Sequence, residues 1–434
     1  MKMTLIQENS LGCSNKFKKQ YYMAKAACIA PISLSLKCLK TTTSPIIEIA
    51  GSIWTLCVTS LSIYGLMHSF VRAQFVDDSD PGFVVTYKMS LPANFLITLI
   101  IISIHNIFKR KSTIDTIEIF MKLDDDIPSS SVMKNKLINV LKLFAIILSI
   151  LFLVIEAWYW KQESNIYYEL FLRICKFLHM LQIVLYAEMV MFIRQKLTEL
   201  TLYLTTNKGC FESNRKTAWD LKMFTTSKGI YPKLQPGRNI STICTSNSTP
   251  IFTSCSFTRF SSSEDNSRDF TSDILELRCG YLKVYNSVKI FNSTYGLTVL
   301  LLILKNCIDL LDIVYSAFAI VSNLSEYRDK YFMGDRSFLI IYWLINIFLV
   351  MFSVTYSSQL VSEEVTKLGD LVQAKLVNYP ISSDISQQLK LFANQLFHNK
   401  IEFYALGFSL NLSFLCTVLM SICSYMTVMV QFKK

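Results

Sequence analysis

A row of polar side chains runs along the last apolar segment of the chain. At about 100° per residue, as in an α-helix, six of them fall within an arc of roughly 120°. Such a stripe either hydrogen-bonds to a neighbouring helix or lines water. Because this stripe runs the whole length of the segment and ends on an amide, a pore lining is the sharper hypothesis and helix packing the simpler one. The six residues are Ser413, Thr417, Ser421, Ser424, Thr427 and Gln431.

Ionisable residues lie inside another apolar segment. Lys305 and Asp309 are four residues apart, so they can pair on one helix face, and Asp312 follows. Burying such groups in lipid is costly. They therefore form either a structural salt bridge packed against other helices or the coupling site of a transporter.

A second set of polar residues recurs every third position and must face inward from its segment. It consists of Lys176, His179 and Gln182, with Glu188 beyond them. A lone histidine in such a place is usually only hydrogen-bonded. No metal-ligand cluster, nucleotide-binding loop or catalytic constellation accompanies it, so neither a metal, a cofactor nor an enzyme activity is predicted.

Aromatic residues gather at the predicted outer ends of three segments. They form either an interfacial belt or the wall of a cavity that takes a small organic ligand, with His179 and Asp312 among its polar groups. These candidate pocket residues are Trp158, Tyr159, Tyr168, Tyr342, Trp343 and Asn346.

The composition says which elements carry these side chains. Of the 434 residues, 52% are hydrophobic and 17% charged, against about 25% charged in ordinary soluble domains. The formal charge of +11 forms no single basic patch, so no nucleic-acid partner is expected. A span needs about 20 apolar residues. This rule predicts an all-α membrane protein with seven transmembrane helices, at 46–71, 89–108, 137–160, 168–193, 295–322, 338–358 and 403–432.

The basic residues orient these spans. Of the 43 Lys and Arg residues, 31 fall on the side that holds the N-terminus. By the positive-inside rule the N-terminus is cytoplasmic and the C-terminus extracellular. A G-protein-coupled receptor has the opposite orientation and would be the alternative if the topology were inverted. All 12 cysteines lie in spans or cytoplasmic segments, where thiols stay reduced. Glycosylation at Asn239 or Asn247 would contradict this orientation.

Six regions follow from these boundaries. The Ser/Thr-rich part of the long loop is expected to be disordered. Amphipathic runs on both sides of Pro380 predict two cytosolic helices that lead into the last span. The regions are a cytoplasmic N-terminal segment (1–45), spans one to four (46–193), a cytoplasmic loop (194–290), spans five and six (291–358), the cytosolic helices (359–402) and the last span (403–434).

The end of the chain resembles the signature of insect gustatory receptors. That signature is Thr-Tyr, five hydrophobic residues and Gln-Phe at the end of the seventh span. The stretch SYMTVMVQF matches it at Tyr425, Gln431 and Phe432, while Ser424 replaces Thr and Thr427 interrupts the hydrophobic five. The preceding stretch FANQLFHNKIEFYALGFSLNLSFL also resembles the family.

The resemblance implies a tastant-gated cation channel in the plasma membrane of sensory neurons. It implies a homo- or heterotetramer whose last spans surround one pore, with contacts from the cytosolic helices and a ligand pocket in the outer half of each subunit. Gln431 and Phe432 would ring the outer gate. The sweet-sensing branch tends to have Glu where Met426 stands, so a bitter or other small organic tastant is expected, with a fructose-gated receptor as the alternative.

Overall fold

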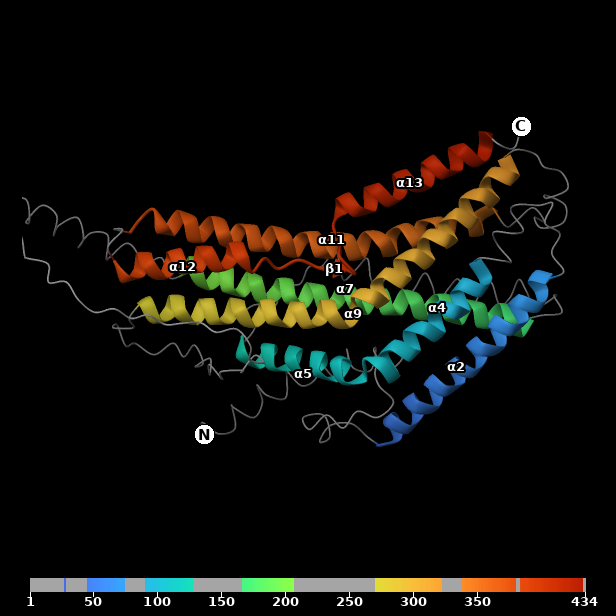
Figure 1. The fold of residues 1–434 in the computed structure, drawn as a ribbon, viewed down its shortest axis with the longest axis horizontal. Helices are drawn as coiled ribbons and strands as arrows, with labels where there is room; N and C mark the ends of the chain where they lie inside the picture. Colours follow the sequence, from blue (N-terminus) through green and yellow to red (C-terminus); the bar gives the residue numbers. More distant parts are fainter. Residues whose placement is uncertain are drawn as a thin grey trace, which may run out of the picture.

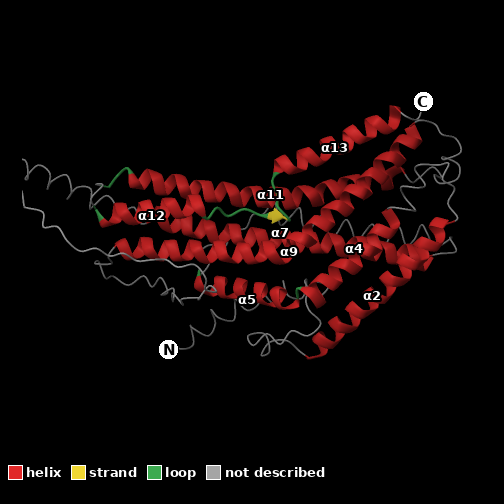
Figure 2. Ribbon diagram, viewed as in Figure 1, coloured by secondary structure: helices red, strands yellow, loops and turns green. Residues whose placement is uncertain are grey.

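The computed structural model describes residues 27–28, 45–74, 90–127, 166–206, 270–321, 337–379 and 383–431. The described part is almost entirely helical (Figures 1 and 2). The predicted all-α membrane fold is confirmed by this architecture.

Three long helices form the axis of the molecule. They are α7 (Ile166–Thr206), α9 (Phe270–Val321) and α11 (Ser337–Leu376), and they run along its longest dimension (Figure 1). At 1.5 Å per residue, the 52 residues of α9 extend about 78 Å, more than twice the roughly 30 Å of a bilayer core. Each long helix therefore continues well outside any membrane that it crosses.

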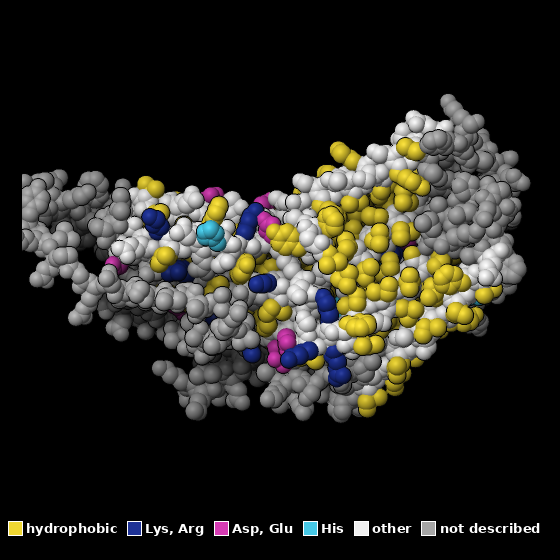
Figure 3. All heavy atoms as spheres, viewed as in Figure 1, with side chains coloured by type: hydrophobic (Ala, Val, Ile, Leu, Met, Phe, Trp, Pro, Cys, Tyr) yellow, Lys and Arg dark blue, Asp and Glu magenta, His cyan; other side chains and the backbone are white. Residues whose placement is uncertain are grey.

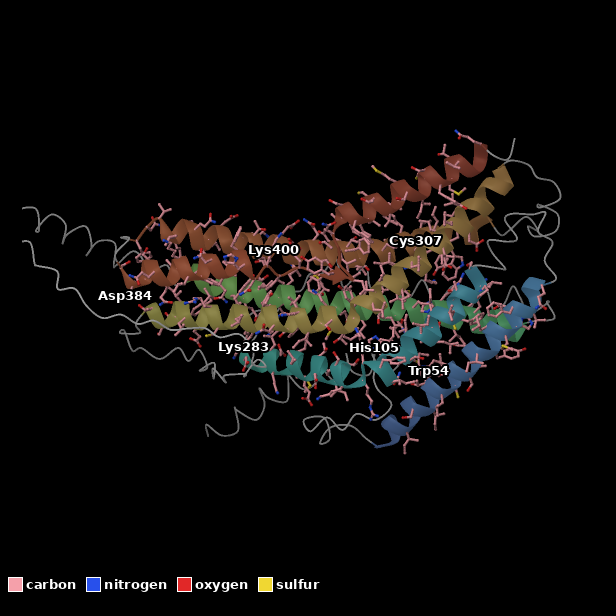
Figure 4. The ribbon with its side chains drawn as sticks, viewed as in Figure 1. Trp54, His105, Lys283, Cys307, Asp384 and Lys400 are labelled. Carbon is pink, nitrogen blue, oxygen red and sulfur yellow. The ribbon has the colours of Figure 1, made fainter. Side chains whose placement is uncertain are left out.

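The first part of the chain packs against this axis. Helix α2 (Pro45–Gln74) contacts α4 (Leu91–Ser103), which passes through a π-helical turn, η2 (Ile104–Phe108), into α5 (Arg110–Asp126). In the turn, the His105 ring (labelled in Figure 4) is hydrogen-bonded on both nitrogens, to Thr113 at 3.1 Å and to Thr298 at 2.8 Å. This histidine ties η2 to α5 and α9.

Helix α11 ends at Leu376, four residues before Pro380 in the sequence, and the last part of the chain follows. Helix α12 (Asp384–His398) starts with Ser383, whose hydroxyl accepts from the backbone N–H of Ser386 at 3.1 Å. A small antiparallel hairpin follows, with strands β1 (Tyr404–Ala405) and β2 (Phe408–Ser409), and helix α13 (Leu412–Gln431) ends the described chain. The helices predicted on both sides of Pro380 are thus present, as the end of α11 and as α12.

An aromatic cluster holds the centre of the molecule together. The ring of Phe291 on α9 lies 5.6 Å from Phe120, 5.1 Å from Tyr186, 4.9 Å from Tyr295 and 5.9 Å from Phe403. These rings come from α5, α7, α9 and the segment before β1. Each such pair contributes about 0.5–1.5 kcal/mol beyond its buried area, so the cluster fixes these elements relative to one another.

The surface divides into an apolar half and a charged half. Hydrophobic side chains gather on the half that carries α2, α4 and α13, and charged side chains on the other (Figure 3). Among the described residues, four helices are long and apolar enough to cross a membrane, and α13 contains a shorter apolar stretch, Leu412–Val428. The four long stretches are Ile49–Val71, Leu91–Phe108, Leu172–Thr205 and Ile341–Leu376.

Six of the seven predicted spans coincide with helices in the described part of the chain, and span 137–160 lies outside it. The start predicted for the last span, residue 403, is wrong because α13 begins at Leu412. The residues between form the hairpin, whose turn places Leu406 (φ 47°) and Gly407 (φ 94°) in the left-handed region. Helices α7 and α9 also extend into the predicted loop 194–290, whose Ser/Thr-rich part lies outside the described residues.

Candidate functional site

The polar stripe of the last helix faces away from the rest of the chain. Helix α13 packs on α9 and α11, with Leu415 and Ile422 buried. The stripe residues Ser413, Thr417, Ser421, Ser424, Thr427 and Gln431 are all exposed. Packing against other helices of the same chain therefore does not explain the stripe.

Three of the five hydroxyl groups of the stripe donate to the helix itself. Thr417 donates to the carbonyl of Ser413 at 2.9 Å, Ser421 to that of Thr417 at 2.9 Å, and Thr427 to that of Cys423 at 2.9 Å. A hydroxyl oxygen that donates its hydrogen still has lone pairs that can accept hydrogen bonds. The stripe can thus accept hydrogen bonds from water or stabilise a passing cation without any change in the helix.

An exposed apolar residue also lies within the stripe. Met420 lies seven residues after Ser413 and seven before Thr427, so the three share a face, and it is 70% exposed. The prediction from the sequence omitted Met420 because it considered only polar residues. Gln431 ends the described helix, and Phe432 lies outside the described residues.

A buried ion pair lies where α9 meets α4. The Nζ of Lys305 is 2.6 Å from Oδ2 of Asp309, and both side chains are 4% exposed. The other carboxylate oxygen accepts from the hydroxyl of Ser90 at 3.1 Å and from the amide of Asn94 at 3.3 Å. Figure 4 marks this stretch of α9 by Cys307. The pair on one helix face is as predicted, and α4 supplies its partners.

The partners on α4 were not predicted, although the sequence contains a signal for them. Ser90, Asn94 and Thr98 are four residues apart and form one polar line on an otherwise apolar helix. Thr98 lies 2.9 Å from Nε2 of His179 on α7, and both residues are buried. The predicted inward-facing histidine is thus hydrogen-bonded, and α4 bridges α7 and α9 with polar contacts.

The other members of the predicted inward face have different surroundings. Gln182 is buried and donates to the carbonyl of Ala27 at 2.8 Å, so it holds a segment near the N-terminus. Lys176 lies over the ring of Trp343 on α11, with Nζ 4.8 Å from the ring centroid, and the Cζ of Arg173 lies 5.6 Å from the same centroid. Tyr342 packs edge-on against Trp343 at 5.4 Å.

The predicted pocket is therefore described only in part. His179 and Asn346 are buried, while Asp312, Tyr342 and Trp343 are half-buried. Tyr168 lies in α7, where its side chain is outside the described set, and Trp158 and Tyr159 fall between the described ranges. No group of three or more metal-ligating side chains occurs within the ranges that the structure describes.

The hairpin connects α9 to the start of α13. The amide of Asn292 donates to the carbonyl of Glu402 at 2.8 Å, and its oxygen accepts from the N–H of Tyr404 at 3.5 Å. At the other end, the side chain of Asn411 accepts from the N–H of Phe414 at 2.8 Å and caps α13. Helix α9 is therefore linked to the base of α13 by a short, hydrogen-bonded segment.

Charge within the hairpin is also paired. The Glu402 carboxylate forms an ion pair with Lys400 and accepts a hydrogen bond from the Tyr404 hydroxyl. Burial opposes ionisation of this carboxyl, but the hydrogen bonds from Lys400 and Tyr404 outweigh it and hold the pKa of Glu402 below its usual value. The group is therefore ionised at neutral pH.

Comparisons with known proteins agree with this architecture. The model of a family described as 7tm chemosensory receptor matches residues 49–434. The fold is similar to the structure of the insect olfactory receptor OR5 from Machilis hrabei, with a TM-score of 0.55, 12% identity and coverage of 97% of this chain and 99% of that chain. The same receptor in complex with eugenol gives a TM-score of 0.54 at 13% identity, with the same coverage. No curated protein matches the sequence.

Proposed function

The chain belongs to the 7tm chemosensory receptor family, and from this premise we propose that it is a taste receptor that acts as a tastant-gated, non-selective cation channel. It would reside as a multi-pass protein in the plasma membrane of sensory neurons. Its ligand would be a bitter or other small organic compound, and a sugar such as fructose is the alternative.

The observation that carries this proposal is the exposed stripe of α13. All six polar residues of the stripe are exposed, and the hydroxyls of Thr417, Ser421 and Thr427 donate to carbonyls within α13. In a single chain such a face would meet lipid, where polar groups are unfavourable. In a tetramer, of identical copies or with sister subunits, the four stripes would line a water-filled pore.

The ends of this stripe suggest how the pore closes. Gln431 stands at the outer end of α13, and Phe432 follows it. A ring of such side chains is a narrow, partly apolar constriction, which can close by losing its water. Met420, exposed in the middle of the stripe, would form a second apolar ring about 16 Å further in, at 1.5 Å per residue over 11 residues.

Ligand binding would act on this gate through α9. A ligand shifts the equilibrium only by its difference in affinity for the closed and open states. The polar contacts of Lys305 and Asp309 and the hairpin contact of Asn292 lie on the same helix. A ligand held among α4, α7, α9 and α11 can therefore bias the position of α13 without touching it.

Expression of the full chain in oocytes, alone and with sister subunits, tests the proposal. Whole-cell currents should follow application of bitter compounds or sugars and should not require G-protein signalling. The variants Gln431→Ala and Phe432→Ala should change ion selectivity or the fraction of open channels. Lys122→Ala is the control, because Lys122 is exposed on α5, on the opposite side of the molecule from α13 (Figure 1) and outside the helices expected to form the tetramer contacts. If both gate variants behave like the control, the pore assignment is wrong.

A further inference from the structure

Two cations of α7 share one aromatic ring of α11. Lys176 and Arg173 lie one helical turn apart, with their charged atoms 4.8 and 5.6 Å from the centroid of Trp343. The ring face attracts each cation, but two like charges on one ring repel each other. An anion beside Lys176 would stabilise its ammonium.

The nearby carboxylates do not supply that anion to Lys176. Both oxygens of Asp309 are engaged, Oδ2 by Lys305 and Oδ1 by the donors from α4. Asp312 has interactions of its own. Among the described residues, Lys176 forms no ion pair with an Asp or Glu. Its ammonium therefore lies over the Trp343 ring and interacts with Asp309 and Asp312 only at longer range.

An unpartnered polar atom lies on the same side of α7. His179 is three residues beyond Lys176 and 1% exposed, and while its Nε2 bonds Thr98, its Nδ1 has no hydrogen-bond partner. Buried polar atoms are normally satisfied by protein, water or a ligand. Arg173, Lys176 and His179 thus form a line of nitrogen groups at helical spacing.

The cluster also remains accessible. Asn346, Ile347 and Val350, on the inward face of α11, are buried at 4–7% exposure, whereas Trp343, one turn nearer the end of the helix, is half-buried. Tyr342 and Lys176 are half-buried as well. Part of each of these side chains is therefore exposed, outside the tightly packed interior.

We propose that Lys176 is the anion-recognition point of the ligand pocket, so that the ligand is a small carboxylate with an aromatic or apolar body. The carboxylate would lie beside the Lys176 ammonium, and the body would pack against Tyr342 and Trp343. The ligand's role in gating rests on the proposed function. The chemistry by which the ligand would bind is independent of it.

A matched series of probes tests the charge preference directly. Equilibrium binding of 3-phenylpropanoate, 3-phenylpropanamide and 3-phenylpropylamine is measured on the purified full chain in nanodiscs. Only the carboxylate can form an ionic hydrogen bond with a lysine, so it should bind about tenfold or more tighter than the amide. The amine should bind most weakly. Equal binding of carboxylate and amide, a preference for the amine, or no carboxylate-preferring binding in the series would overturn the proposal.

Variants of Lys176 test whether this residue causes the preference for the carboxylate. Lys176→Gln should bring the affinities for carboxylate and amide together, whereas Lys176→Arg, which keeps the charge, should preserve the difference. Lys122→Gln is the control, because that lysine is exposed on α5, outside the helices expected to form the tetramer contacts. An unchanged preference in Lys176→Gln rejects the assignment. Carboxylate-selective binding without any current would contradict the channel proposal alone, and currents without charge selectivity would contradict this inference alone.

Discussion

A Cβ atom on Gly296 of α9 would lie 3.0 Å from the backbone carbonyl oxygen of Tyr404 in the hairpin. The opposing atom belongs to the backbone, so it cannot turn away as the end of a flexible side chain would. One turn earlier, Asn292 hydrogen-bonds to Glu402 and Tyr404, at the start of the same strand. Glycine at 296 thus permits the close approach through which α9 holds the segment leading into α13.

Enlarging Gly296 should separate these two elements. Gly296→Val forces the Tyr404 backbone away from α9, and overpacking of this kind costs about 1–3 kcal/mol. The melting temperature of the detergent-solubilised chain, followed by size-exclusion chromatography, should fall. Gly369→Val is the matched control, because nothing lies within 4 Å of a Cβ at that position. Equal melting temperatures for the two variants would show that the contact is not tight.

Breaking the buried ion pair should be more damaging than removing it. Lys305→Met leaves the Asp309 carboxylate buried without its cation, which should cost about 3–5 kcal/mol of stability. The double variant Lys305→Met/Asp309→Leu should recover much of that loss, and a thermal double-mutant cycle measures the coupling. The partly exposed pair Lys283–Asp126 is the comparison, with an expected coupling of about 0–1 kcal/mol. Similar coupling in both cycles would argue against a buried pair.

The stripe of α13 should be reachable by water-soluble reagents. In a Cys416→Ala/Cys423→Ala background, which removes the two exposed cysteines of the helix, Ser421→Cys should react with a cationic methanethiosulfonate and lose current. Ile422→Cys should not react, because that position is 8% exposed. Reaction at 422 but not at 421 would place the pore on the other face of α13.

Acid should weaken the hairpin through Glu402. Its pKa is held below the usual value in the folded chain, so its stabilising contribution is present at neutral pH and is lost as the pH falls through the folded-state pKa. The wild type should therefore be more stable than Glu402→Gln at about pH 7, with the difference shrinking towards pH 4. The effect should be small because Lys400 is 61% exposed. Melting curves across this range test it, and a difference that grows on acidification would contradict the pairing.

Much of the architecture could be predicted from local patterns. Apolar runs of sufficient length predicted the spans, Pro380 predicted the break between α11 and α12, and the spacing along α13 predicted one polar face. Each of these depends on a property of a single helix, namely its length, its breaker or its period of 3.6 residues. The hairpin was missed because residues 404–409 read as the start of an apolar span and Leu406 is an unusual residue for a left-handed turn position.

The sequence by itself determined that this is an all-α membrane protein of the chemosensory type, and it determined which side chains share a helix face. Only the tertiary structure decided what each face meets. The hydrogen bond from Ser90 to Asp309 joins residues 219 positions apart, and Lys176 meets Trp343 because α7 and α11 pack together. The helical period sets the direction of a side chain within its own helix, but the partner in that direction depends on how helices distant in sequence pack.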